Sequence, residues 1–255
     1  MTWNPQQYLK FSESRLRPAV DLLARVGAEA PERVYDLGCG AGNVTRLLVE
    51  RWPGATITGI DDSAEMLARA AKELPHVKWI NQGVQAWQPD LPVDVIFSNA
   101  ALHWLPDHDA LFPALVDKLA SGGVLAVQMP RNFLAPSHAL IADTVRAGSW
   151  RSKLEHLLGP PPVAAPEQYY AWLAPVARNI DIWETEYLQP LQGEDPVKEW
   201  TKGTWLTRFL PYLEQSERAA FEEDYARRLR VAYPRRADGT TLFPFRRLFI
   251  VCQKG

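Results

Sequence analysis

The stretch Val34-Tyr35-Asp36-Leu37-Gly38-Cys39-Gly40-Ala41-Gly42-Asn43 decides the fold. A short apolar strand ends near an acidic residue, and three glycines at alternate positions lead directly into a helix. Glycines suit a turn that needs positive φ, or a ligand that approaches the backbone closely. The GxGxG spacing differs from the GxGxxG of dinucleotide binders, and the Asp36 carboxylate would repel a pyrophosphate. The stretch therefore predicts a site for a ligand with an ammonium or sulfonium centre.

Outward from this stretch, short β-branched runs alternate with helical segments, which is the pattern of a parallel sheet covered on both faces. The strands expected in the first half are Arg33–Leu37, Thr56–Asp61, Val77–Asn81, Val93–Ser98 and Gly123–Met129. The helices expected between them are Asn43–Arg51, Ser63–Glu73 and Ala110–Leu119. For the second helix, Asp62 is predicted as the N-cap, with Glu65 completing a capping box.

The second half has a different pattern. Residues 136–179 are expected to form a helical insertion over the sheet edge, broken at Gly159-Pro160-Pro161-Pro162. The elements expected after it are a strand at Ile180–Leu188, helices at Pro196–Leu213 and Ser216–Ala232, and a final strand at Leu242–Gln253. The two late strands would complete the same sheet, so the chain is predicted to be one domain over residues 1–255.

Composition narrows the classes of function. The 255 residues carry 28 Lys+Arg against 30 Asp+Glu, a formal net charge of -2, which gives no global attraction for nucleic acid. The two cysteines, Cys39 and Cys252, have no zinc-like spacing, and no metal site is expected. The sequence shows neither a signal peptide nor a membrane span, so a cytoplasmic protein without a membrane or nucleic-acid partner is predicted.

A carboxylate closes the second expected strand, in Thr58-Gly59-Ile60-Asp61-Asp62-Ser63, about 20 residues past the glycine loop. Asp61 is placed to accept both ribose hydroxyls of a ligand, while Asp62 serves better as the helix cap. Met66, about one helical turn further on, suits packing against an adenine ring, although a methionine taken in isolation more often has a core role. The carboxylate alone does not separate an adenosine ligand from NAD.

Three motifs taken together resemble the series found in class I S-adenosylmethionine-dependent methyltransferases: residues 36–42, residues 59–67 and residues 94–104. The resemblance implies an α/β, Rossmann-like fold with a seven-stranded, mostly parallel sheet, an antiparallel last strand and a helical insertion over the active site. It also implies that Asp36 and the glycine loop hold the methionine part of the cofactor and that Asp61 holds the ribose. The residues that it assigns to the cofactor are Asp36, Gly38, Cys39, Gly40, Asn43, Asp61, Asp62, Met66, Val84, Gln85 and Asn99, with adenine also near Trp87.

One position departs from that pattern. Many relatives carry an aspartate where this chain has Gly83. Adenine is therefore expected to be read there by backbone N–H and C=O groups.

Further motifs are similar to the trans-aconitate 2-methyltransferase family and extend the resemblance over nearly the whole chain: Trp3–Phe11, Gln128–Asn132, Lys202–Thr204 and Asp238–Pro244. The family implies methyl transfer to a carboxylate of a small tricarboxylic acid, which yields a monomethyl ester and S-adenosylhomocysteine. It suggests N-terminal lid helices at 1–30, a cofactor-binding core at 31–130, substrate-cap segments at 136–179 and 194–232, and a final strand at 242–253. A monomer or weak homodimer is expected.

A carboxylate acceptor is already ionised at pH 7, so no general base is required. The carboxylates that are not methylated call for arginines, which pair with them in a bidentate manner. The substrate-binding candidates are Arg131 at the carboxyl edge, Arg15 and Arg17 from a lid, Arg246 or Arg247 from the last hairpin, and the aromatic residues Tyr8, His103, Trp104 and Trp205. His103 is expected to donate a hydrogen bond to the substrate.

Other functions remain open at this level. A hydroxyl or amine acceptor would make His103 the first candidate for a general base. A non-catalytic cofactor-binding protein shares the fold. An NAD-dependent oxidoreductase shares the early strand-helix pattern, but the glycine spacing and the acid before the loop oppose it.

Overall fold

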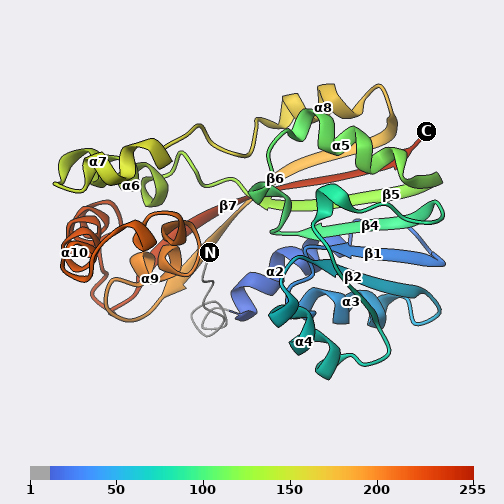
Figure 1. Cartoon of the computed structure of the whole chain (residues 1–255), viewed down its shortest axis with the longest axis horizontal. Coiled ribbons are helices and arrows are strands. Elements are labelled where there is room, and N and C mark those ends of the chain that lie inside the picture. Colours follow the sequence, from blue (N-terminus) through green and yellow to red (C-terminus); the bar gives the residue numbers. More distant parts are fainter. Residues whose placement is uncertain (1–11) are drawn as a thin grey trace. The chain divides into compact units, whose positions relative to one another are not determined.

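A seven-stranded sheet organises the described part of the chain, residues 12–255 of a computed structural model (Figure 1). The strand order is β3-β2-β1-β4-β5-β7-β6. The strands are β1 (Arg33–Leu37), β2 (Thr56–Asp61), β3 (Lys78–Asn81), β4 (Val93–Asn99), β5 (Leu119–Pro130), β6 (Ala177–Leu191) and β7 (Thr241–Lys254). The first five strands pair in parallel, whereas β7 runs antiparallel to β5. The predicted Rossmann-like α/β fold is confirmed, including its mostly parallel sheet with an antiparallel last strand.

The central strands are buried on both faces. Val95, Ile96 and Phe97 in β4 are each 0% exposed, as are the consecutive residues 125–127 in β5. Consecutive side chains of a strand point to opposite faces, so such a run needs helices on both sides. Each large apolar side chain buried in this way contributes roughly 1.5–3 kcal/mol. This is why apolar runs, rather than alternating patterns, mark these strands in the sequence.

Helices cover the sheet and form a second cluster. They are α2 (Ser12–Leu23), α3 (Asn43–Arg51), α4 (Ala64–Glu73), α5 (His108–Asp117), α6 (Pro136–Ala147), α7 (Arg151–Leu154), α8 (Pro166–Leu173), α9 (Pro196–Lys202) and α10 (Gln215–Ala232). Short 3-10 turns are η1 (Val84–Ala86), η2 (Leu102–Trp104), η3 (Glu155–Leu157), η4 (Trp205–Arg208) and η5 (Leu210–Tyr212). Among these described helices, none is both long and apolar enough to cross a membrane.

Two local predictions were wrong. The expected helix Pro196–Leu213 is interrupted, because α9 ends before Gly203 and Pro211 limits the next segment to short turns. The N-cap of α4 is Ser63 rather than Asp62: the Ser63 hydroxyl accepts a hydrogen bond from the Met66 N–H at 3.3 Å. The helix therefore begins one residue later than a cap at Asp62 would place it.

The chain divides into two compact units, and each is described by itself. The sheet unit comprises residues 15–130, 162–185 and 247–255. The helical unit, in its described part, comprises residues 12–14, 131–161 and 186–246. The expected insertion 136–179 is therefore split, since 136–161 belong to the helical unit and 162–179 to the sheet unit. The assignment of one domain to the whole chain stays a prediction.

In the sheet unit, helix α8 packs against α5 (Figure 1). The Tyr169 ring meets the Phe112 ring edge-on at 4.8 Å. His108 Nε2 lies 2.9 Å from the Leu102 carbonyl oxygen, and its Nδ1 lies 2.6 Å from the Tyr169 hydroxyl. Because a carbonyl only accepts, Nε2 carries the proton and Nδ1 accepts from Tyr169. Burial lowers the pKa of His108, so the ring stays neutral and tethers α8 to the sheet unit.

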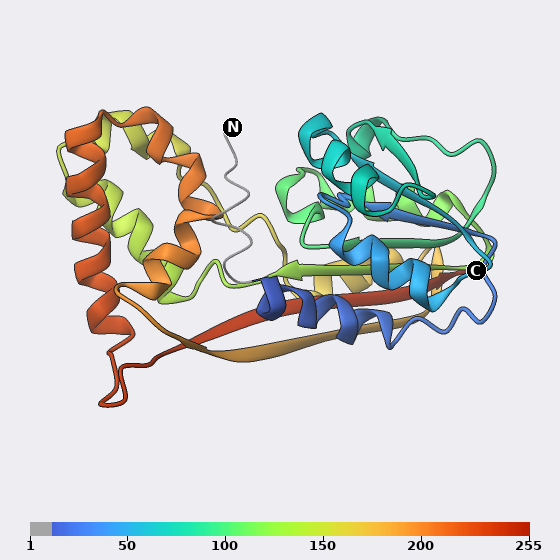
Figure 2. The same cartoon turned by 90° about the horizontal axis from the view of Figure 1, so that it is seen from below.

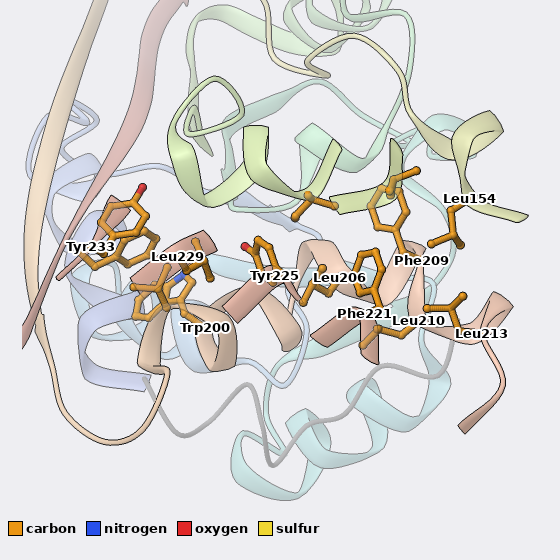
Figure 3. Packing of buried hydrophobic residues seen from close by; sticks show 14 of the residues in the cluster. Leu154, Trp200, Leu206, Phe209, Leu210, Leu213, Phe221, Tyr225, Leu229 and Tyr233 are labelled. Carbon is orange, nitrogen blue, oxygen red and sulfur yellow. The ribbon is translucent and has the colours of Figure 1, made fainter. Parts of the chain in front are cut away.

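The helical unit has its own apolar core (Figure 3). Phe221, Tyr225 and Leu229 form one stripe of α10 at four-residue spacing. Residues packed with this stripe include Leu154, Trp200, Leu206, Phe209, Leu210, Leu213 and Tyr233. Two hydroxyls also hold α6 within this core: Tyr225 donates to the Ser137 carbonyl at 2.5 Å, and Tyr233 accepts from the Ser137 N–H at 3.1 Å.

Candidate functional site

The glycine loop joins β1 to α3 in the sheet unit, as Figure 2 shows from below. Gly38, Gly40 and Gly42 have φ of 73°, 54° and 81°. A Cβ on Gly38 would lie 2.1 Å from Ala101 Cβ, and one on Gly40 would lie 3.3 Å from Met66 Cε. The glycines are thus required by a left-handed backbone and by close packing, in addition to the close ligand approach expected from the sequence.

Asp36 lies at the base of this loop and is 1% exposed. The Thr45 hydroxyl of α3 donates a hydrogen bond to Asp36 Oδ2 at 2.6 Å. Burial, reinforced by the negative charge of Asp61, raises the pKa of Asp36 to about 7 despite that hydrogen bond. A nearby cation would stabilise the ionised form and return the pKa towards its usual range. The loop therefore suits a ligand with positive charge.

Asp61 ties the loop to β2. Its Oδ2 accepts from the Gly40 N–H and its Oδ1 accepts from the Ser63 N–H, both at 2.9 Å. An ionised carboxylate has about four lone-pair sites, so two acceptor positions remain beyond these bonds. This is the number that two adjacent ribose hydroxyls require.

The other cofactor candidates surround these two acids. Met66 lies against Gly40, and Asp62 is exposed at the loop before α4. Val84 and the exposed Gln85 belong to η1, which follows Gly83 in the loop after β3. The remaining candidates are Cys39, whose buried thiol has a raised pKa and stays protonated, Asn43, exposed at the first turn of α3, and Asn99, the last residue of β4. Trp87 is 1% exposed and lies in the core, with its ring centroid 4.9 Å from that of Tyr35.

The substrate candidates fall into both units. His103 and Trp104 lie in η2, with ring centroids 4.7 Å apart, and His103 is buried whereas Trp104 is 43% exposed. Arg247 is 6% exposed and pairs in register with Pro130, at the carboxyl end of β5. Arg17 is exposed on α2. These four belong to the sheet unit.

Arg131 and Trp205 belong to the helical unit. The Arg131 N–H donates to the Arg246 carbonyl at 2.9 Å, and the Trp205 ring meets Phe133 at 4.9 Å and carries the Arg208 guanidinium over its face at 4.5 Å. The alternative candidate Arg246 forms an exposed ion pair with Glu186 at 3.5 Å. Tyr8 and the side chain of Arg15 lie outside the described residues.

Sequence reasoning missed two residues at this edge. Trp79 fills the space beside Gly42 and Gly59, where added Cβ atoms would lie 3.0 Å and 2.3 Å from its ring. Gln128 in β5 is 0% exposed, and neither polar atom of its amide has a hydrogen-bond partner in the structure of residues 12–255. The polar residue within an otherwise apolar strand was the signal for Gln128. No cluster of three or more metal-ligating side chains occurs among the residues described.

The strand order, the glycine loop and the two acids define a class I methyltransferase. A family model described as a methyltransferase domain matches residues 8–185. Two relatives named trans-aconitate 2-methyltransferase are 48% identical (Azoarcus sp., 98% of each chain covered) and 42% identical (Rhizobium etli, 100% of each chain). The chain belongs to the trans-aconitate 2-methyltransferase family.

Solved structures agree with this fold. The YcgJ protein of Bacillus subtilis superposes with a TM-score of 0.62 at 15% identity, covering 93% of this chain and 98% of that one. Phosphoethanolamine N-methyltransferase 2 of Haemonchus contortus, in complex with phosphomonomethylethanolamine and S-adenosylhomocysteine, superposes with a TM-score of 0.55 at 17% identity, covering 93% of this chain and 52% of that one. At such identities the likeness concerns the architecture alone.

Proposed function

We propose that this chain transfers the methyl group of S-adenosylmethionine to a carboxylate of trans-aconitate, giving the monomethyl ester and S-adenosylhomocysteine. The observation that carries the proposal is full-length similarity to relatives that bear this activity in their names, at 41–48% identity. The candidate residues at the carboxyl ends of the strands also support the proposal, because the acids suit the ribose and the positive charge of the cofactor and the arginines suit the carboxylates of the acceptor.

For the cofactor, the fit rests on the glycine loop and the two acids. The buried Asp36 and the N-terminus of α3 would hold the methionine part, and Asp61 would accept the ribose hydroxyls through its remaining lone pairs. Met66 and the η1 turn would enclose the adenine, with backbone groups reading its edge where Gly83 replaces an acid. Asn99, at the end of β4, would face the ammonium group. When bound, the cofactor supplies an electrophilic methyl group on a sulfonium.

For the acceptor, this chain has to bind an anion and hold it in line. The acceptor carboxylate is already ionised at neutral pH, so no residue of this chain has to remove a proton, and the chain would hold the carboxylate in line with the methyl group that the cofactor supplies. Orientation of such reactants is worth roughly 7–11 kcal/mol, which makes positioning the main task of the protein. Arg131, Arg247, Arg17 and Arg15 would pair with the other carboxylates, and His103 would donate a hydrogen bond. Tyr8, Trp104 and Trp205 would shape the walls.

We further propose that residues 1–30 act as a lid, 31–130 as the cofactor core, and 136–179 with 194–232 as a substrate cap on a single-domain protein. We also propose that the protein is cytoplasmic, that it is a monomer or a weak homodimer, and that it binds no nucleic acid. A net charge of -2 supports the absence of nucleic-acid steering. Size-exclusion chromatography with light scattering would test the oligomeric state. A filter-binding assay on duplex DNA would test the absence of nucleic-acid binding.

The decisive experiment is turnover with methyl-labelled S-adenosylmethionine and a panel of small acids that includes trans-aconitate. Label is expected in a base-labile ester of trans-aconitate. An Arg131→Ala variant should raise KM for the acid about tenfold to hundredfold, the loss of a charge-assisted pairing, with a smaller effect on kcat. Arg51→Ala, at an exposed site at the end of α3, is the matched control. Binding of the cofactor without transfer to any acid would refute the proposal and direct the search to hydroxyl or amine acceptors.

A further inference from the structure

The buried amide of Gln128 has no structural role that the described residues explain. Its side chain is 0% exposed, and both Nε2 and Oε1 lack a hydrogen-bond partner within residues 12–255. Only the backbone of Gln128 is engaged there, since its carbonyl accepts from the Ala100 N–H at 2.9 Å. A buried amide without partners is costly, whereas an apolar side chain of similar size would fill the same space without that cost. Such a group indicates a partner that arrives from outside the chain.

The sheet register places Gln128 beside the cofactor residues. Gln128 pairs with Asn99 of β4, whose Oδ1 is also buried and without a partner in the described structure. Asp36 pairs with Phe97, and Asn99 follows two residues after Phe97 on the same strand. Residues in register, and residues two apart, project from the same face of a sheet. Asp36, Asn99 and Gln128 therefore share one face at the carboxyl edge.

The strand order gives Gln128 its place along this edge. From β2 to β5 the edge carries Asp61, the glycine loop, Asn99 and then Gln128. With strands about 4.8 Å apart, β5 lies about 10 Å beyond β1, on the side opposite to Asp61. If Asp61 holds the ribose and Asn99 faces the ammonium, the next strand outward borders the acceptor. This step rests on the function proposed above.

We propose that Gln128 is a catalytic residue that orients the acceptor: its Nε2–H donates a hydrogen bond to the carboxylate that receives the methyl group. A neutral donor fixes the direction of the carboxylate but adds no full positive charge beside the attacking oxygen. An arginine at this position would neutralise the nucleophile, and so the arginines are suited to the carboxylates that do not react. No atom is transferred to or from Gln128.

The first variant is Gln128→Met, which keeps the size of the side chain and removes both polar groups. Its apo form should melt higher than the parent by about 2–4 °C, because an unpartnered amide has been removed. Its kcat with trans-aconitate should fall on the order of tenfold to hundredfold, while its affinity for S-adenosylhomocysteine stays within about threefold. A second variant, Gln128→Glu, keeps an acceptor oxygen but repels a carboxylate, and should lose transfer with equally unchanged cofactor affinity.

Gln253→Met is the matched control. Gln253 lies on β7 opposite Val124, at the far end of the stretch of β5 that pairs with β7, and its Oε1 accepts from the Asn179 amide at 2.7 Å. Removing this partnered amide should lower the melting temperature and leave kcat unchanged, the reverse of the Gln128→Met pattern.

Three results would overturn the proposal: a lower melting temperature of Gln128→Met, which would reveal a structural partner; unchanged transfer by that variant; or a loss of transfer explained by weaker cofactor binding. Failure of the proposed function gives a different result, because the parent protein itself would then methylate none of the acids.

Discussion

The carboxylate of Asp61 and the backbone of Gly40 are joined by a hydrogen bond of 2.9 Å, so the ribose candidate and the glycine loop form one unit. An Asp61→Asn substitution leaves one carbonyl oxygen where two carboxylate oxygens accepted. Affinity for S-adenosylhomocysteine should fall about tenfold to hundredfold, equivalent to roughly 1.5–3 kcal/mol. Isothermal calorimetry measures this loss. Glu65→Gln, at an exposed site on α4, should bind normally, and an unaffected Asp61→Asn would remove Asp61 from the site.

The raised pKa of Asp36 predicts a linkage between protons and cofactor. Its pKa is about 7 when folded against 3.8 ordinarily, so between these values the native state holds a proton that the unfolded chain has lost. The contribution of Asp36 to stability is therefore largest below pH 3.8 and is lost as pH rises through about 7. A bound cation favours the ionised form, so affinity for S-adenosylmethionine should increase from pH 6 to pH 8 with release of a proton below about pH 7.

Calorimetry in two buffers of different ionisation enthalpy detects that proton. Asp36→Asn should abolish the pH dependence and weaken binding, while Thr45→Val should raise the pKa of Asp36 further, because the 2.6 Å hydrogen bond lowers it. Equal binding enthalpies in both buffers at pH 6.5 would contradict the linkage.

Gly38 is predicted to be intolerant of a side chain for two separable reasons. Its φ of 73° costs an alanine about 1–2 kcal/mol, and the added Cβ would lie 2.1 Å from Ala101 Cβ. Gly38→Ala should therefore lower the melting temperature strongly, and the double variant with Ala101→Gly should recover part of the loss. Gly27→Ala, where no atom lies within 4 Å of the new Cβ, serves as control. Full recovery in the double variant would show that φ contributes nothing.

Tyr225 is predicted to stabilise the helical unit through its hydroxyl. Tyr225→Phe preserves the packing in Figure 3 but leaves the buried Ser137 carbonyl without this donor. The expected loss is about 1–3 kcal/mol of unfolding free energy, measured by urea denaturation. Tyr170→Phe, at a site 56% exposed, should change little. Equal midpoints for both variants would argue against the hydrogen bond.

The sequence predicted the sheet well because buried parallel strands leave local signals. Arg33–Leu37 and Thr56–Asp61 have the predicted bounds, since apolar β-branched runs end there in an acid or a turn. The cap at Ser63 was missed because Asp62 and Ser63 are both good N-caps, and only the hydrogen bond from the Met66 N–H to the Ser63 hydroxyl distinguishes them.

Long-range features were beyond local patterns. The division of residues 136–179 between two units depends on contacts such as Tyr169 with His108, across 61 positions of the chain. That the Gln128 amide has no hydrogen-bond partner depends on its neighbours in β4 and β7, Asn99 and Phe249, which lie far away in the sequence. Arg131 was predicted from its place just after a strand and Arg247 from its place in the last hairpin, and the roles of both towards a substrate stay predictions.

The antiparallel pairing of β7 with β5 also has a consequence for the solubility of fragments that lack β7. The family model ends at residue 185, but β5 from Val124 to Pro130 is partnered by Arg247–Gln253. A fragment cut at residue 185 would keep every cofactor candidate and yet present a bare edge whose residues 125–127 are normally 0% exposed. Open apolar edges recruit other strands, so such a fragment should precipitate. Residues Arg247–Gln253, near the C-terminus, thus cover the β5 edge and keep the segment with the cofactor candidates from aggregating.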